Sequence, residues 1–307
     1  RFNMTTFQLN DFALWTALVT PFDLNGAVDY DSLAKIVDDQ QQAGNGILIC
    51  GSTGEGLAIE QSEQLNIIKF ICDLNPSVPL MVSVGGFNLP TQVDWIKACN
   101  DLPVHSYLLT APIYAKPGVI GQTQWFSALL DAAKHPCMLY NVPSRSGISI
   151  PVKTVENLAE HRNLWAMKEA SGDVNEFLAY AAAAPKMKMF SGEDALIPYL
   201  APVGAVGLVS VCANAWPEAT NLYVQKSLAG EGANLTPVWY NAISSLFEEA
   251  NPVPVKVLMH KQAVLNTPTL RAPLSHLELE SDNAILAADL DITEWLCQSR
   301  TNVRLVK

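Results

Sequence analysis

Eight short apolar runs alternate with longer amphipathic stretches in the first three quarters of the chain. Strands are expected at 13–19, 46–50, 80–84, 106–110, 137–141, 164–168, 187–191 and 206–211. Helical periodicity is found between them, at 30–43, 61–73, 91–100, 122–133, 152–158 and 174–184. Near-continuous apolar strands separated by helices indicate a parallel sheet with helices packed on it. Eight such units predict a (β/α)8 TIM barrel rather than an open doubly wound sheet.

The strand signal stops near residue 230. Residues 237–250, 254–265 and 283–299 are predicted to be helices joined by turns that contain Pro and Asn. We therefore expect two parts: a barrel carrying the active site at 1–230 and a C-terminal helical subdomain at 231–307. The helical part is expected to pack on the barrel or on a neighbouring subunit.

Composition excludes several classes of function. Hydrophobic residues make up 49% of the 307 residues and charged residues 16%, which suits a large buried core. The net charge of −11 repels phosphate backbones, so nucleic-acid binding is not expected. No apolar stretch reaches the ~20 residues of a membrane helix. The six cysteines contain no CxxC and the five histidines no HExxH, which predicts reduced thiols in a cytoplasm and neither a metal nor another cofactor.

Lys168 ends an apolar strand and is followed at once by a polar turn at 169–172. In a barrel of this kind, chemistry is located at the carboxyl ends of the strands. An amine delivered there into an apolar pocket is desolvated, loses its preference for the charged form and becomes a nucleophile towards carbonyls. On this fragment alone, a solvent-facing lysine is the simpler interpretation. The other strand ends favour the pocket.

The second strand is followed by Gly-Ser-Thr-Gly-Glu-Gly at 51–56. Glycines permit a tight turn with exposed backbone N–H groups, and the positive end of a following helix would add to them. With the hydroxyls of Ser52 and Thr53, the turn predicts a cradle for a carboxylate or phosphate. The spacing is not the GxGxxG of a dinucleotide loop. A ligand-free turn is the alternative.

Two further strand ends carry polar side chains that could reach the same pocket. Residues 140–147 contain Tyr140 and Arg145, and the planar guanidinium of an arginine matches a carboxylate. Residues 111–118 place Tyr114 between two prolines that stiffen the loop. As alternatives, Tyr140 could be a buried structural hydroxyl and Tyr114 an aromatic residue at a subunit contact.

The seventh strand leads into Gly192, Glu193 and Asp194. The glycine would let the backbone approach a bound ligand closely. The two carboxylates are expected to do no more than start a helix, because acidic residues favour that end.

Together these segments resemble the pyruvate-dependent Schiff-base aldolases, and within them the dihydrodipicolinate synthase branch. The resemblance runs from 14–22 through 51–55, 140–147 and 168–172 to 209–211, and continues less specifically through the helical tail. Arg145 is the discriminating residue, because the sialic-acid lyase branch usually has other residues there.

The resemblance implies that Lys168 forms an imine with pyruvate, whose carboxylate lies in the cradle at Ser52 and Thr53. The resulting enamine would attack the aldehyde of L-aspartate 4-semialdehyde, whose carboxylate Arg145 would bind. This reaction is the first committed step of diaminopimelate and lysine biosynthesis. The resemblance also implies substrate contacts at Gly192 and Val209.

The proton relay of the family implies roles for Ser52, Tyr140 and Tyr114, with Tyr114 supplied by a neighbouring subunit of a homotetramer built as a dimer of dimers. Serine stands at 52 where the family usually has threonine, and the hydroxyl is retained.

Relatives that lysine inhibits often carry histidines, a glutamate and a tyrosine at positions matching Gln61, Gln64, Gln92 and Ile113, with Asn88 retained. The missing carboxylate and phenol predict weak or absent feedback inhibition by lysine.

Two alternatives remain at this stage. The first is a related aldolase acting on N-acetylneuraminate or a 2-keto-3-deoxy sugar acid, which would share Lys168 and Tyr140. The second is a barrel that binds keto acids as a sensor without turnover.

Overall fold

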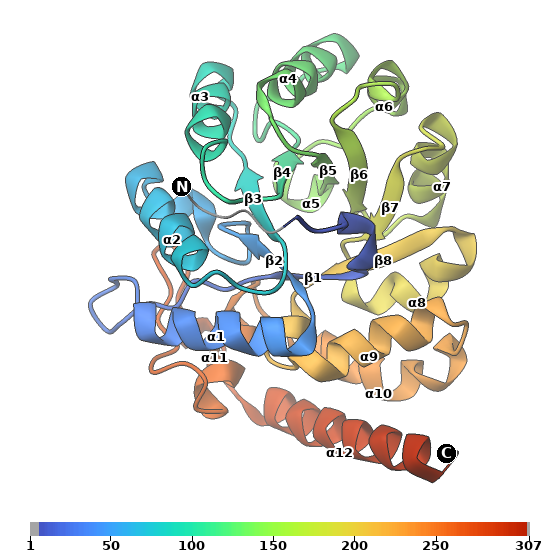
Figure 1. Cartoon of the computed structure of the whole chain (residues 1–307). Coiled ribbons are helices and arrows are strands. Elements are labelled where there is room, and N and C mark those ends of the chain that lie inside the picture. Colours follow the sequence, from blue (N-terminus) through green and yellow to red (C-terminus); the bar gives the residue numbers. More distant parts are fainter. Residues whose placement is uncertain (1–5, 306–307) are drawn as a thin grey trace.

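Eight parallel strands close into a barrel in sequence order in the computed structural model of the chain, which describes residues 6–305. The strands are β1 (Leu14–Ala17), β2 (Gly46–Ile49), β3 (Leu80–Val84), β4 (Ser106–Thr110), β5 (Cys137–Asn141), β6 (Leu164–Glu169), β7 (Lys188–Ser191) and β8 (Ala205–Ser210). The pairing of Trp15 on β1 with Val209 on β8 closes the ring. The predicted TIM barrel is confirmed (Figure 1).

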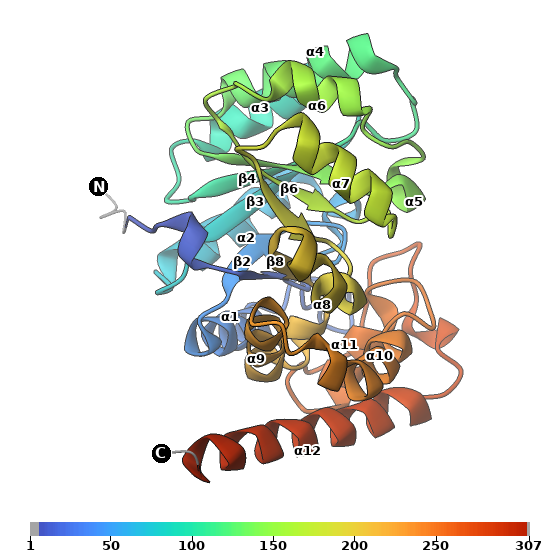
Figure 2. The same cartoon turned by 90° about the vertical axis from the view of Figure 1, so that its right-hand side faces the viewer.

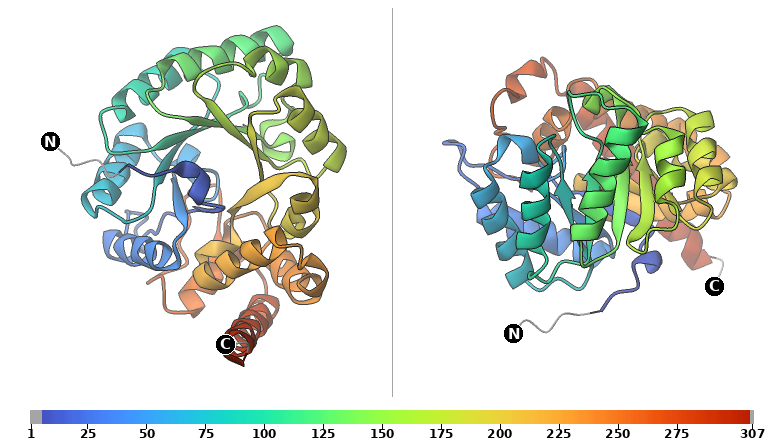
Figure 3. Two further views of the ribbon diagram at one scale, coloured as in Figure 1. Left: turned by 45° about the vertical axis from the view of Figure 1, so that its right-hand side comes forward. Right: turned by 90° about the horizontal axis from the view of Figure 1, so that it is seen from above.

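A ring of helices surrounds the strands (Figure 3, left). It contains α1 (Tyr30–Ala43), α2 (Gln61–Asp73), α3 (Leu89–Cys99), α4 (Val119–Ala132), α6 (Val152–Leu158), α7 (Val174–Ala183), α8 (Ile197–Leu200) and α9 (Pro217–Leu228). Local capping explains several boundaries. Asp29 accepts a hydrogen bond from the N–H of Ser32 to start α1, and Gly44 ends it with a φ of 75°. Asn88 starts α3 two residues earlier than predicted.

The sequence reading missed α8, α9 and the short helix α5 (Pro143–Ser146). Each has a proline in its first turn, where the missing N–H costs nothing. Helices this short, or with mixed surfaces, leave little periodicity in the sequence.

The C-terminal part forms α10 (Thr236–Ser245), α11 (Val253–Lys261) and α12 (Asn283–Leu305). The helix predicted at 237–250 is five residues too long at its C-terminal end, because α10 ends at Ser245. The N–H groups of Leu246 and Phe247 donate to the carbonyls three residues earlier, those of Ile243 and Ser244, which tightens the chain into a turn. The chain from there to α11 turns towards the barrel. Figure 2 shows α5 and α11 on the side of the barrel away from the N-terminal segment, with α12 lying along α10.

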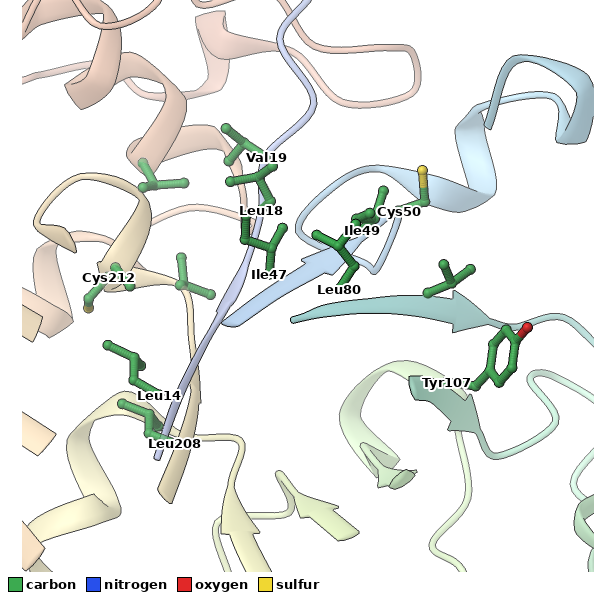
Figure 4. Packing of buried hydrophobic residues seen from close by; sticks show 14 of the residues in the cluster. Leu14, Leu18, Val19, Ile47, Ile49, Cys50, Leu80, Tyr107, Leu208 and Cys212 are labelled. Atoms are coloured by element: carbon green, nitrogen blue, oxygen red, sulfur yellow. The ribbon is translucent and has the colours of Figure 1, made fainter. Parts of the chain in front are cut away.

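The strands alternate between two apolar layers, as period-2 side-chain geometry requires. Ile47 and Ile49 pack outward against the helices, in the layer that Figure 4 shows in part, whereas Leu48 points into the barrel. Inside, Trp15 meets Trp165 edge to face at 6.1 Å between ring centroids, and Trp165 meets Phe190 at 5.6 Å. These rings fill the interior beneath the site.

No helix in the part of the chain that the structure describes is long and apolar enough to cross a membrane. All six cysteines are free; five are buried as predicted, and Cys297 is exposed on α12.

Candidate active site

Lys168 and Tyr140 lie side by side on neighbouring strands inside the barrel. They are register partners of β6 and β5, so their side chains point to the same face of the sheet. The Lys168 Nζ lies 4.1 Å from the centroid of the Tyr140 ring. Only 5% of the Lys168 surface is exposed. The strand therefore delivers the amine into the protein, as the apolar run before it predicted.

Gly192 follows β7 and packs against the stem of that lysine. A Cβ at this position would lie 3.0 Å from Lys168 Cε and 2.6 Å from the Cβ of Ala170. The Gly192 N–H donates to the carbonyl of Glu169 at 2.7 Å. Glycine is thus required here by close packing against the lysine, and the backbone it exposes lies next to the amine.

The turn at 51–56 is held by its own backbone. Hydrogen bonds run from the N–H of Glu55 to the carbonyl of Ser52 (3.1 Å) and from the N–H of Gly56 to the carbonyl of Gly51 (3.0 Å). The expected helix does not follow directly: a 3-10 turn at Gly56–Ala58 intervenes, and α2 begins at Gln61. The positive end of α2 therefore does not cap this turn.

A buried ion pair beneath the turn was not found by sequence reading. The Lys256 Nζ donates to Glu55 Oε1 and to the carbonyl of Thr20, each at 2.8 Å, and both charged side chains are essentially unexposed. The N–H of Arg271 donates to the other Glu55 oxygen at 2.8 Å. Burial lowers the pKa of Lys256 to about 8, although Glu55 opposes the change. Because Lys256 lies 201 residues from Glu55 along the chain, no local pattern signals this contact.

Arg145 lies on α5, directly after β5, and is exposed in the single chain. Its Nη2 donates to the backbone carbonyl of Asn251 at 3.1 Å. Tyr114 has a φ of 65°, and its N–H donates to the carbonyl of Ser146 at 3.2 Å. The Tyr114 side chain is 85% exposed, so the structure does not bring it to Lys168 within the chain.

One cavity of about 620 Å³ opens at this end of the barrel. Ser52, Tyr140 and Arg145 line it. Its other walls include the residues considered above for lysine regulation: Gln61, Gln64, Asn88, Gln92 and Ile113. The two groups, taken from separate segments of the sequence, thus face a single space.

The carboxylates after β7 do stand at the start of a helix, the 3-10 turn Asp194–Leu196, but Asp194 has a second role. Asp194 is buried and accepts hydrogen bonds from Ser210 Oγ and the N–H groups of Val211 and Cys212, so it links the ends of β7 and β8. Burial raises the pKa of Glu193 to about 7; Asp194 adds to this rise and Lys168 opposes it. Val209 is buried on β8 within the barrel interior.

Comparison with known proteins adds an independent finding. The sequence model described as Dihydrodipicolinate synthetase family matches residues 12–291. The chain is 47% identical over 283 residues to a 4-hydroxy-tetrahydrodipicolinate synthase from Francisella tularensis subsp. novicida, covering 92% of this chain and 96% of that protein.

Solved structures agree. A chloride-inhibited dihydrodipicolinate synthase from Acinetobacter baumannii, complexed with pyruvate, superimposes with a TM-score of 0.87 at 32% identity, covering 92% of this chain and 99% of that one. A synthase from Cyanidioschyzon merolae with lysine bound gives 0.87 at 26% identity, with coverages of 92% and 99%. With a closed barrel, a lysine buried at the end of its sixth strand and this degree of similarity along nearly its whole length, the chain belongs to the dihydrodipicolinate synthetase family.

Proposed function

We propose that the chain condenses pyruvate with L-aspartate 4-semialdehyde through a Schiff base on Lys168, giving 4-hydroxy-tetrahydrodipicolinate in the diaminopimelate route to lysine. One observation carries this proposal: the Lys168 amine lies inside the barrel against the ring of Tyr140, and Tyr140 lines a cavity together with Ser52 and Arg145. The names of the curated relatives support the same reaction.

The first half of the reaction uses the buried amine. The Lys168 Nζ attacks the ketone carbon of pyruvate, the carbinolamine loses water, and the iminium draws electrons from the methyl group. Loss of a methyl proton then leaves an enamine. Tyr140, beside Nζ, and Ser52, on the same cavity, are the proposed proton carriers. A positioned relay of this kind contributes roughly 10²–10⁴-fold in rate.

The second half uses the outer part of the site. The enamine carbon attacks the aldehyde of the semialdehyde and forms a carbon–carbon bond, while Arg145 holds the substrate carboxylate by charge-assisted hydrogen bonds. The amine of the semialdehyde then attacks the imine carbon, closes the ring and releases Lys168 as a free amine. Thr53, Gly192 and Val209 are the proposed contacts to the pyruvate unit.

The relay is completed in our proposal by Tyr114 from a second subunit, since its side chain is exposed in the single chain. We propose a homotetramer built as a dimer of dimers and a cytoplasmic location. The division at residue 230 into a barrel and a helical subdomain is likewise kept as a proposal.

Weak or absent inhibition by lysine is proposed from the cavity wall. Gln61, Gln64, Asn88 and Gln92 offer amides, and Ile113 offers no hydroxyl. A lysine ligand carries two ammonium groups at neutral pH, and neutral amides hold such groups more weakly than a carboxylate does. A steady-state assay with added lysine tests this proposal. Inhibition at millimolar lysine or below would contradict it.

Trapping the imine tests the central step. Sodium borohydride with pyruvate should reduce the Schiff base and leave a stable adduct on Lys168, located by peptide mass measurement. Lys168→Ala should form no adduct and have no turnover, whereas Lys188→Ala, at the other end of neighbouring β7, should behave like wild type. Turnover in Lys168→Ala would overturn the mechanism. Absence of an adduct on Lys168 in the wild-type protein would favour a keto-acid sensor.

The related aldolases are the second candidate and share Lys168 and Tyr140. The position of Arg145 on the cavity wall favours a carboxylate-bearing aldehyde over a polyhydroxylated chain. Parallel assays with the semialdehyde, N-acetylneuraminate and a 2-keto-3-deoxy sugar acid distinguish the two reactions.

A further inference from the structure

We infer that Asn251, contributed by the C-terminal part of the chain, is a positioning residue that orients the Thr53 hydroxyl towards the pyruvate carboxylate and ties it to Arg145. The inference rests on the proposed function, because it concerns the substrates of that site. Asn251 precedes α11 and is only 7% exposed.

Asn251 contacts both proposed carboxylate-binding elements. Its Nδ2 donates to Thr53 Oγ1 at 2.9 Å in a fully buried hydrogen bond. Its backbone carbonyl accepts from Arg145 Nη2 at 3.1 Å. Thr53 follows β2 and Arg145 follows β5, so a single residue outside the strands joins two segments on different sides of the barrel.

The direction of the first hydrogen bond has a chemical consequence. A threonine hydroxyl has one proton to donate and can accept two hydrogen bonds. When Thr53 Oγ1 accepts from Asn251, its own proton stays available for another acceptor. A carboxylate is such an acceptor, and the resulting bond is charge-assisted. The amide thus sets the Thr53 hydroxyl as a donor to an anion.

Asn251 is itself held firmly. One turn further along α11, the buried Lys256 donates to Glu55, which lies two residues after Thr53. On the other side of the turn, Thr20 Oγ1 donates to the carbonyl of Gly54 at 2.7 Å. The turn is therefore fixed to α11 by Lys256 and to the segment after β1 by Thr20. The Asn251 Oδ1 is buried and has no hydrogen-bond partner among residues 6–305, so the side-chain amide is held in the described structure by the bond that Nδ2 donates to Thr53.

The test is a comparison of Asn251→Asp, Asn251→Ala and Thr53→Val by steady-state kinetics. In Asn251→Asp the side chain only accepts, so the Thr53 proton turns towards it and an anion lies beside the carboxylate cradle. The KM for pyruvate should rise about ten- to hundredfold, the range for losing a hydrogen bond to a charged group. The kcat at saturating pyruvate should fall much less.

A double-mutant cycle tests whether Asn251 acts through Thr53. In the Thr53→Val background, Asn251→Ala should leave the KM for pyruvate unchanged, while the same change in wild type should raise it severalfold. Because the Arg145 contact uses the backbone, the KM for the semialdehyde should change less than the KM for pyruvate. Asn163→Ala is the matched control, since Asn163 Nδ2 donates to two carbonyls, those of Leu130 and Ala133, at the opposite end of β6; both KM values should stay at wild type.

Two results would overturn the inference: wild-type affinity for pyruvate in Asn251→Asp, which would mean that Thr53 already donates to this side chain, or equal effects of Asn251→Ala with and without Thr53. Borohydride trapping at saturating pyruvate separates this failure from failure of the mechanism. The variants should still form the Lys168 adduct, whereas its absence in the wild-type protein would reject the proposed function itself.

Discussion

Removing one partner of the Lys256–Glu55 pair should strongly destabilise the fold. In Lys256→Met, the Glu55 carboxylate stays buried and loses the lysine that donates to it. The backbone N–H of Arg271 still donates to its other oxygen. Breaking a buried pair in this way costs about 3–5 kcal/mol of unfolding free energy. The charge-free double variant Lys256→Met with Glu55→Gln should lose much less than the sum of the two single changes.

The pH dependence gives the two single variants opposite signs. The folded-state pKa of Lys256 is lowered to about 8 from 10.5, so between these values the unfolded chain binds more protons and stability rises with pH. Glu55→Gln removes the interaction that opposes this lowering. Its deficit should therefore shrink as the pH rises from neutrality and the amine becomes neutral. The deficit of Lys256→Met should shrink towards acid pH, where the stranded carboxylate takes up a proton.

Urea unfolding monitored by tryptophan fluorescence, at acid, neutral and alkaline pH and one fixed protein concentration, measures these effects. Lys186→Met is the control, because its partner Glu160 and Lys186 itself are both exposed; an exposed pair contributes about 0–1 kcal/mol. The reasoning is refuted if both single variants stay within about 1 kcal/mol of wild type, if the double variant equals their sum, or if the two pH trends share a sign.

Three further predictions concern the site. Gly192→Ala places a Cβ 2.6 Å from that of Ala170 and should slow the formation of the imine, measured by borohydride trapping, at least about tenfold. Gly118→Ala is the control, because the space around Gly118 is open, and it should not slow this step. Equal rates in the two variants would contradict the packing argument. The pKa of Glu193 is raised from 4.5 to about 7, so the wild-type protein loses stability as the pH rises through that window. The unfolding free energy of Glu193→Gln, measured by urea titration, should therefore increase by about 1–2 kcal/mol relative to that of wild type between pH 5 and pH 8. A difference between the two proteins that does not change with pH would refute this. Mixing inactive Tyr114→Phe and Lys168→Ala subunits should restore up to about a quarter of wild-type activity, because half of the subunit pairs are mixed and each mixed pair has one complete site out of two. If no activity returns after subunit exchange has been verified, Tyr114 acts in the site of its own subunit or lies outside the relay.

The barrel was predictable because its signals are local. Strands such as Leu80–Val84 and Ser106–Thr110 are continuous apolar runs whose bounds the structure reproduces, and the full helix Tyr30–Ala43 is bracketed by an Asp cap and a Gly stop. In a barrel, the carboxyl ends of all the strands meet at one face, so the positions of Lys168 and Tyr140 at two strand ends predict that they lie near each other.

The rest of the site was not predictable because its contacts are distant in sequence. Asn251 lies 198 residues from Thr53 and 106 from Arg145. In the sequence, Asp194 is an ordinary acidic residue at the start of a helix. Only the fold shows that its carboxylate accepts hydrogen bonds from Ser210 and from the backbone directly after β8. Periodicity reports which face of an element is buried, but not which partner it meets.

The aromatic rings at the floor of the barrel have a kinetic consequence. Trp15, Trp165 and Phe190 meet edge to face in the barrel interior, and a Cβ on Gly46 would already lie 2.6 Å from the indole of Trp15. Substrates and product would then use the same opening, at the carboxyl ends of the strands. In the proposed reaction, pyruvate would then have to reach Lys168 before the semialdehyde enters, and the cyclic product would have to leave before the next pyruvate binds.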